Sequence, residues 1–217
     1  MKAQFSIGPT LIATAAAFLL ISCFGEDNPV EDARKTAAIR KVGVTVDSGS
    51  VSPQLPAGAQ SGRSFDSLAA EDSATYTDPG NYGIDLAYYF LINNTAEDAE
   101  DAKFDGLTAD IVFDTLSNPP VTAESGAFEV AKNETRKVPV STSMNMAEHR
   151  LPCLYVFQQI VDGADVKTTV SPNLSYKIGL AQGVIEIPDI VVNIPTRASE
   201  ETKEFLSGML QSGLFEK

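Results

Sequence analysis

Apolar and polar residues alternate with a period of two along much of the chain after residue 83. The segment 84–94, IDLAYYFLINN, is rich in aromatic and β-branched residues, which predicts a central strand with both faces covered. The segment 107–116 places apolar residues on one face and Thr and Asp on the other, apart from Val112. The alternation therefore predicts at least two strands in this part of the chain.

Two later stretches and one earlier segment continue the strand pattern. Residues 126–146 are predicted as two strands joined by a turn at 132–134, and Pro139 lies inside the second of them. Because proline has no N–H to donate to a ladder, it indicates an edge strand or a bulge. Residues 173–195 return to alternation, and a shorter alternating segment at 39–47 predicts the first strand.

Two segments have a helical period instead. In residues 149–163, HRLPCLYVFQQIVDG, apolar positions recur every three or four residues, Pro152 suits the first helical turn and Gly163 suits the stop. In residues 198–217, Ser199 is a candidate N-cap, acids follow it, and the apolar residues share one face. The pattern predicts one helix inserted among the strands and a short C-terminal amphipathic helix.

These elements predict a mainly β chain, in which residues 37–197 form an immunoglobulin-like antiparallel β-sandwich. Residues 48–83 interrupt it, because they are rich in Gly, Ser, Pro, Asp and Asn. We expect a long, partly disordered loop there that cannot pack a core, with Phe65 and Leu68 pinning it.

The start of the chain has the features of a lipoprotein leader. Residues 1–22 carry one charge, Lys2, and an unbroken apolar and small-residue run at 11–21. That run is too short for a membrane span of about 20 residues but suits the hydrophobic region of a signal peptide. The sequence Leu-Ile-Ser-Cys at 20–23 resembles the lipobox of bacterial lipoproteins. The resemblance implies cleavage before Cys23, attachment of diacylglycerol to its thiol, and acylation of the new amine with a fatty acid such as palmitate.

A lipid on Cys23 would hold the mature chain at a membrane, because two or more acyl chains anchor a protein stably. Residues 23–36 are polar, acidic and contain a proline, so we expect a tether between the lipid and the domain. Phe24 stands where an Asp would resemble the inner-membrane retention signal of Gram-negative lipoproteins. We therefore expect the protein in the cell envelope, anchored in the outer membrane of a Gram-negative bacterium.

The second cysteine, Cys153, lies in an apolar stretch. If Cys23 carries lipid, Cys153 has no partner for an internal disulfide. A small buried core residue is the favoured interpretation of Cys153 over a reactive thiol.

Charge excludes one class of partner. The chain has 29 acidic and 16 basic residues and a formal net charge of -13. Such a surface repels nucleic acid phosphates and anionic lipid headgroups, so nucleic acid is not an expected partner. The expected partners are the membrane, through the N-terminal lipid, and an envelope protein or an apolar ligand.

The order of features over residues 37–195 is similar to the late embryogenesis abundant type 2 family, also called the water-stress and hypersensitive-response domain. The resemblance rests on YYFLINN at 88–94, on the strand region 107–144 and on SYKIGLAQGVIEIPDIVVNIP at 175–195. It implies an immunoglobulin-like or fibronectin-like sandwich with a helix, and a binding or stress-protective role without catalysis. Two features depart from the family pattern: the turn at 93–95 lacks the family proline, and the long predicted loop separates the first two strands.

No catalytic set of residues or cofactor motif is apparent in the sequence. His149 is the one histidine, and it lies between Glu148 and Arg150 where a solvent-exposed residue at a helix start is expected. The glycines are scattered singly, which is typical of turns and not of a phosphate-binding loop. We therefore expect a non-enzymatic protein without a cofactor.

An acidic loop is the sharpest polar feature of the chain. Several carboxylates in one short segment could hold calcium, although their spacing is not that of an EF-hand. A solvated hairpin loop is the favoured interpretation, and no metal site is assigned. The candidate calcium ligands are Glu97, Asp98, Glu100, Asp101 and Asp105.

Four tyrosines near the long predicted loop could form a platform for a sugar or a peptide, because rings stack on apolar faces while hydroxyls reach polar groups. They are Tyr76, Tyr82, Tyr88 and Tyr89. Tyr88 and Tyr89 point to opposite faces of one strand, so at least one of them is expected in the core.

Three functions remain open from the sequence, and the third of them is a hydrolase that would use His149 and the acidic loop. The leading interpretation is a membrane-anchored envelope lipoprotein whose non-catalytic sandwich binds a partner or protects against stress. The alternative is a carrier or chaperone of an apolar ligand in the envelope, with a cleft between the sheets and the C-terminal helix.

Overall fold

A computed structural model describes residues 29–114, 116, 119–178 and 181–215. The predicted signal peptide and Cys23 lie outside the described residues. Among the residues that the structure describes, no helix combines the length and the apolar character needed to cross a bilayer.

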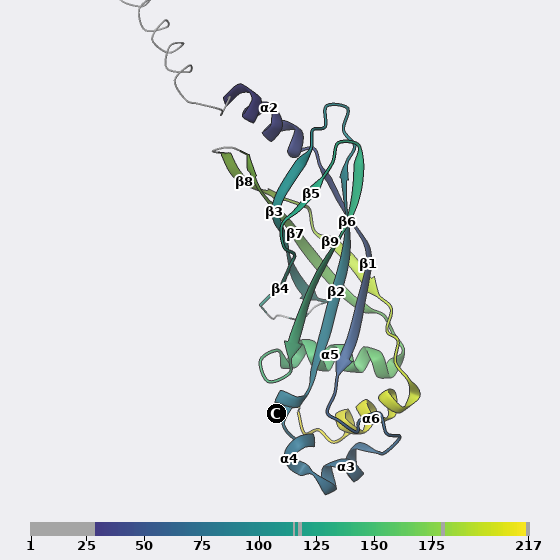
Figure 1. Ribbon diagram of the computed structural model, residues 1–217. Coiled ribbons are helices and arrows are strands. Elements are labelled where there is room, and N and C mark those ends of the chain that lie inside the picture. Colours follow the sequence, from purple (N-terminus) through teal and green to yellow (C-terminus); the bar gives the residue numbers. More distant parts are fainter. Residues whose placement is uncertain (1–28, 115, 117–118, 179–180, 216–217) are drawn as a thin grey trace, which may run out of the picture.

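The described chain contains nine antiparallel strands in one continuous sheet (Figure 1). The strand order is β1-β2-β6-β4-β3-β7-β8, with β5 paired to β3 and β9 paired to β7. The strands are β1 (Gly43–Gln54), β2 (Gly83–Asn94), β3 (Ala102–Phe113), β4 (Val121–Glu124), β5 (Phe128–Val130), β6 (Glu134–Asn145), β7 (Val166–Ile178), β8 (Ala181–Glu186) and β9 (Ile190–Ile194).

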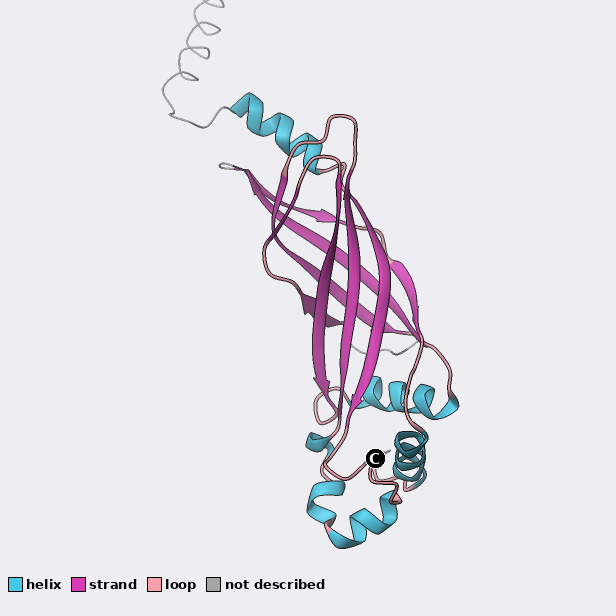
Figure 2. Ribbon diagram, turned by 45° about the vertical axis from the view of Figure 1, so that its right-hand side comes forward, coloured by secondary structure: helices cyan, strands magenta, loops and turns pink. Residues whose placement is uncertain are grey.

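The sheet folds over on itself into two layers. The long strands β1, β2 and β6 form one layer, and β3 and β7 with the shorter strands cross behind them (Figure 2). One residue pair, Glu124 of β4 with Ser141 of β6, joins the layers through the ladder. The predicted mainly β, antiparallel sandwich is therefore confirmed.

Strand β2 shows how the sequence pattern fills the core. It pairs with β1 on one side and with β6 on the other, so it is central as predicted. Every second residue from Ile84 to Ile92 is buried, whereas Asp85 and Tyr89 on the other face are exposed. The prediction that both faces are covered is wrong, because no further layer of the described residues packs on the outer face of β1, β2 and β6.

Helices close both ends of the sandwich (Figure 1). Helix α2 (Pro29–Ile39) lies at one end, where the chain enters the domain. The opposite end carries α3 (Phe65–Glu71), α4 (Ser73–Tyr76), the 3-10 turn η1 (Pro79–Asn81), α5 (Arg150–Asp162) and α6 (Glu200–Gln211).

Helices α5 and α6 confirm the sequence prediction. Gly163 ends α5 with φ 64°, in the left-handed conformation that favours glycine. Ser199 caps α6 by accepting a hydrogen bond from the Thr202 N–H. Cys153 is a fully buried core residue of α5, also as predicted.

Two segments differ from the prediction. The second half of the expected tether at 23–36 is helical, because α2 begins at Pro29. The expected loop at 48–83 is ordered: β1 continues to Gln54 through its backbone pairing with β2, and three short helical elements follow. The prediction that this segment packs no core is also wrong, since its apolar side chains are buried beside Phe205 of α6.

Candidate functional site

The acidic loop is bound to cations of the protein itself. Asp98 forms an ion pair with Lys41, and Glu100 forms one with Arg34 at 3.1 Å. Asp101 accepts a hydrogen bond from the Lys132 backbone N–H. Within the described ranges, no three His, Cys, Asp or Glu side chains gather where they could hold a metal ion. The candidate calcium ligands, including Glu97 and Asp105, are therefore not assembled into a site. Three of them, Asp98, Glu100 and Asp101, instead contact Lys41, Arg34 of α2 and the Lys132 backbone.

The tyrosine platform does not form either. Tyr76, Tyr82 and Tyr88 are at most 6% exposed and belong to the core, whereas Tyr89 is 38% exposed. The expectation that Tyr88 or Tyr89 is a core residue is confirmed. Tyr89 faces solvent with the Lys137 ammonium 4.5 Å from its ring centroid.

His149 is the N-cap residue of α5, and its side chain makes no capping hydrogen bond. It is half-buried at the start of the helix. The solvent-exposed position expected for it is therefore only partly realised. In the part of the chain that the structure describes, His149 belongs to no cluster of possible metal ligands.

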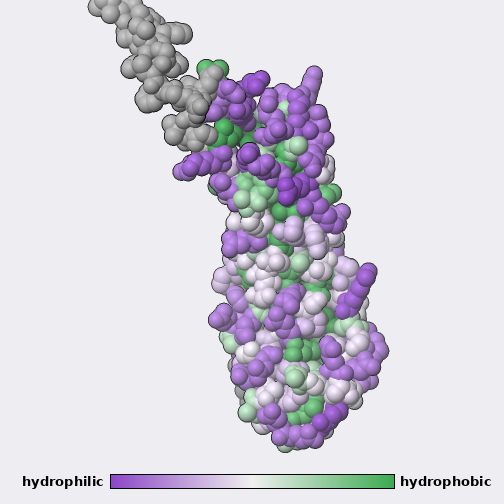
Figure 3. Space-filling model, viewed as in Figure 1, coloured by the Kyte–Doolittle hydropathy of each residue, from purple (hydrophilic) through white to green (hydrophobic). Residues whose placement is uncertain are grey.

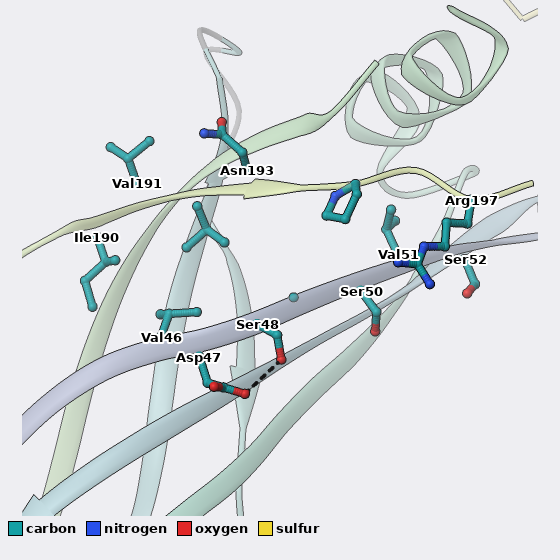
Figure 4. Close-up of a pocket in the computed structure, with 13 residues that line it drawn as sticks. Val46, Asp47, Ser48, Ser50, Val51, Ser52, Ile190, Val191, Asn193 and Arg197 are labelled. Carbon is teal, nitrogen blue, oxygen red and sulfur yellow. Dashed lines mark hydrogen bonds between the residues drawn. The ribbon is translucent and has the colours of Figure 1, made fainter. Parts of the chain in front are cut away.

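A groove between β1 and β9 has a volume of about 700 Å³. Both strands contribute side chains to it, as does the chain just after β9 (Figure 4). Its lining consists of residues 46–52 of β1, residues 190–193 of β9, Pro195 and Arg197. This volume lies within the range of about 300–1,000 Å³ that is usual for ligand pockets.

The two strands that flank the groove are neighbours without being paired. Residue numbers rise in both strands from the end with Val46 and Ile190 to the end with Ser52 and Arg197, so β1 and β9 run parallel (Figure 4). Strand β1 pairs with β2 and β9 pairs with β7, and no ladder joins β1 to β9 among the described residues. The groove is therefore a seam between the first and the last strand of the sandwich.

Gly49 and Ile194 close the seam on its inner side. A Cβ atom at Gly49 would lie 2.9 Å from Cγ1 of Ile194, which is fully buried. The missing side chain of Gly49 thus leaves room for the isoleucine to fill the core beneath the groove. The groove is open to solvent above this contact and does not lead into the core.

Charge in the groove is low. Lys137 of β6 donates a hydrogen bond of 2.6 Å to Asp47, and this ammonium lowers the pKa of the carboxyl. Arg197 extends toward β1 beside Val51 and Ser52 (Figure 4), and it forms no ion pair with any of the described residues. The remaining lining is Ser, Gly, Val, Ile, Pro and Asn. Such a surface offers backbone groups, hydroxyls, small apolar side chains and the Arg197 guanidinium.

The hydropathy of the surface agrees with this. In Figure 3, hydrophilic residues crowd the end near α2, whereas the middle of the molecule over the strands is pale and carries few strongly hydrophilic residues.

A second cavity, of about 410 Å³, lies at the charged end between α2 and the ends of β3 and β7. Two of its three lysines, Lys35 and Lys103, form ion pairs with Glu31 and Glu129.

Sequence reasoning missed the groove. Its β1 side falls in the segment predicted to be a loop, because a register shift between Val46 and Ser48 breaks the alternation. Allowing for one extra residue there, Val44, Val46 and Val51 share the inner face. A search for an alternation interrupted by a bulge would have extended the first strand.

Comparisons with known proteins add little to this geometry. No protein-family model matches the chain, and no curated protein matches it. A protein from Archaeoglobus fulgidus, known from a crystal structure, is similar over 71% of this chain and 100% of that chain, with 11% sequence identity and a TM-score of 0.37. A likeness at this level supports no inference about function.

Proposed function

We propose that this protein is a lipid-anchored protein of the bacterial cell envelope whose β-sandwich is a non-catalytic binding domain, with a stress-protective role as one form of that function. The observation that carries the binding role is the β1–β9 groove, which is open, weakly charged and bounded by two unpaired strand edges. The carboxylate that lines it, Asp47, is bound to Lys137. These features suit binding better than acid–base chemistry.

The lipobox motif supports the anchor, and chain length limits how far the domain can lie from it. Five residues separate Cys23 from Pro29, and the six residue steps between the two span at most about 20 Å in an extended chain. Lipid on Cys23 would therefore keep the α2 end near the membrane. The helical end would point away from the membrane, and the groove would run along the flank.

Replacing the lipidated cysteine tests the anchor. We expect Cys23→Ala to lose incorporation of labelled palmitate and to leave an uncleaved precursor or a soluble form. Cys153→Ala is the matched control, because it removes the other cysteine and should leave labelling and membrane fractionation unchanged. Undiminished label on Cys23→Ala would contradict the proposal. Protease treatment of intact cells would then show whether the domain faces the periplasm or the outside.

A carrier of an apolar ligand is the second candidate. The space between the sheets and α6 is filled by side chains such as Tyr82 and Phe205, which are both buried. An apolar ligand would have to use the open groove, where Val46, Ile190 and Val192 offer an apolar end. Native mass spectrometry of the full chain in a mild detergent tests this, since a co-purifying lipid of fixed mass would favour the carrier.

A further inference from the structure

Strand β1 has one satisfied edge and one open edge. It pairs with β2 over its whole length, from Gly43 to Gln54. Its other edge faces β9 across the groove without a ladder between them. Backbone N–H and C=O groups along such an edge form a ready template for another extended chain.

The two outer edges of this layer are protected differently. The edge of β6 away from β2 pairs with β4 at Ser141, and the part before Ser141 carries Arg136, Lys137 and Pro139, the charged residues and proline with which proteins commonly block strand addition. The edge of β1 from Ser48 to Ser52 has the sequence Ser-Gly-Ser-Val-Ser and carries neither. Small side chains there let another backbone approach closely. The contrast indicates that this part of β1 is left open to pairing.

We propose that the groove binds an extended segment of a partner polypeptide, which adds to the edge of β1 as a strand. This rests on the proposed binding function and names its partner class. The register shift after Val46 and the proline at position 53 bound the open edge, so the added strand is short. The segment runs antiparallel to β1, because antiparallel pairing makes the more favourable ladder.

The lining predicts the side chains of that segment. At the end with Val46 and Ile190, which point toward each other in Figure 4, the inward positions of the segment are aliphatic. At the other end, the Arg197 guanidinium favours a carboxylate. An antiparallel segment brings its N-terminal end to Arg197. The preferred partner therefore has an acidic residue followed by alternating β-branched residues.

Hydrogen exchange of backbone amides tests strand addition directly, because pairing protects the N–H groups of the edge. The probe is the acetylated peptide Asp-Val-Thr-Val-Thr-Val-Thr, added to the full chain in detergent. At a free peptide concentration about ten times its Kd, exchange should slow about tenfold in fragments that cover β1. Fragments of β6 and β8 should not change. The same peptide with N-methyl groups at alternate residues should give no protection.

Matched variants locate the site. Ser50→Lys puts a charge on the proposed edge and should weaken binding at least tenfold, whereas Gln182→Lys adds the same charge to exposed β8 and should not. Arg197→Glu should weaken the acidic peptide and strengthen a peptide that begins with Lys in place of Asp. Such a charge swap cannot arise from loss of folding.

Four results would overturn the proposal. Three of them are the absence of protection at millimolar peptide, protection confined to β6 or β8, and equal binding of the Ser50→Lys variant. Concentration-dependent protection of the β1 amides without peptide would also overturn it, because it would identify a second copy as the occupant. None of these results depends on palmitate labelling of Cys23. Failure of the strand-addition proposal is therefore distinguishable from failure of the proposed lipid anchor.

Discussion

The Tyr88 hydroxyl of β2 lies 2.8 Å from Oγ1 of Thr168 in β7, and both groups are fully buried. The Thr168 hydroxyl also donates to the Val192 carbonyl at 3.4 Å, so the tyrosine is the donor in the first bond. This chain of hydrogen bonds links one layer of the sandwich to the other and continues to β9. It fixes the strand that forms one side of the groove.

Removing the Tyr88 hydroxyl and removing the Thr168 hydroxyl should change the free energy of unfolding by different amounts. Tyr88→Phe leaves the Thr168–Val192 bond in place and should lower the free energy of unfolding by about 1 kcal/mol. Thr168→Val leaves the buried Tyr88 hydroxyl without its hydrogen-bond partner and should lower the free energy of unfolding by about 2–3 kcal/mol. Urea denaturation measures both. The double variant should be more stable than Thr168→Val alone, because it removes the hydroxyl that has lost its partner. A double variant less stable than Thr168→Val would contradict this account.

Two glycines with positive φ differ in their surroundings. Gly58 has φ 93°, and a Cβ there would lie 2.7 Å from the Tyr76 hydroxyl oxygen, whereas Gly62 has φ 74° and open space around it. Gly62→Ala should cost about 1 kcal/mol from backbone strain alone. Gly58→Ala should cost about 1–3 kcal/mol more, because it also displaces the tyrosine. Thermal unfolding of the two variants separates these contributions, and equal costs would show that the Tyr76 contact is unimportant.

Thiol chemistry should report on both cysteines at once. Burial raises the pKa of Cys153 to about 12, so its thiolate is scarce at pH 8 and its sulfur is shielded. The mature native protein should give no reaction with Ellman's reagent, and the protein unfolded in guanidinium should give one thiol. A reactive thiol in the native protein would mean that Cys23 is not lipidated. Cys153→Ala should abolish the reaction of the unfolded chain.

Alkaline pH should destabilise the fold. Burial raises the pKa of Cys153, and likewise those of the Tyr82 and Tyr88 phenols. The folded chain therefore retains these protons at pH values where the unfolded chain has lost them. Stability from these groups is complete below their unfolded pKa values, near 8.5 for the thiol and 10 for the phenols, and falls as pH rises above them. Urea midpoints at pH 8 and pH 10.5 test this, and Cys153→Ala should show a smaller fall.

Much of the fold could be predicted because its signals are local. Pro152 and Gly163 lie at the two ends of α5, and the alternation from Ile84 to Ile92 marks the buried face of β2. Helix α2 was missed although local signals were present, since Pro29 stands at its first position and acids follow in the first turn.

The candidate site could not be predicted in the same way. The second half of β1 is a strand because β2 supplies its hydrogen bonds, and the Ser-Gly-Ser composition of that half carries no strand signal of its own. The groove also needs β9, which lies far away in the sequence. A site made by two strands that are distant in sequence depends on the fold as a whole, so no local pattern of residues predicts it.

The contact of Gly49 with Ile194 has a consequence for how the chain folds. Nearly the whole domain separates these residues in the sequence, so this contact closes one of the longest loops in the protein. Contacts of such separation slow folding, and during synthesis β9 emerges only after every other strand. The seam between β1 and β9 can therefore form only after nearly all of the domain has been synthesised.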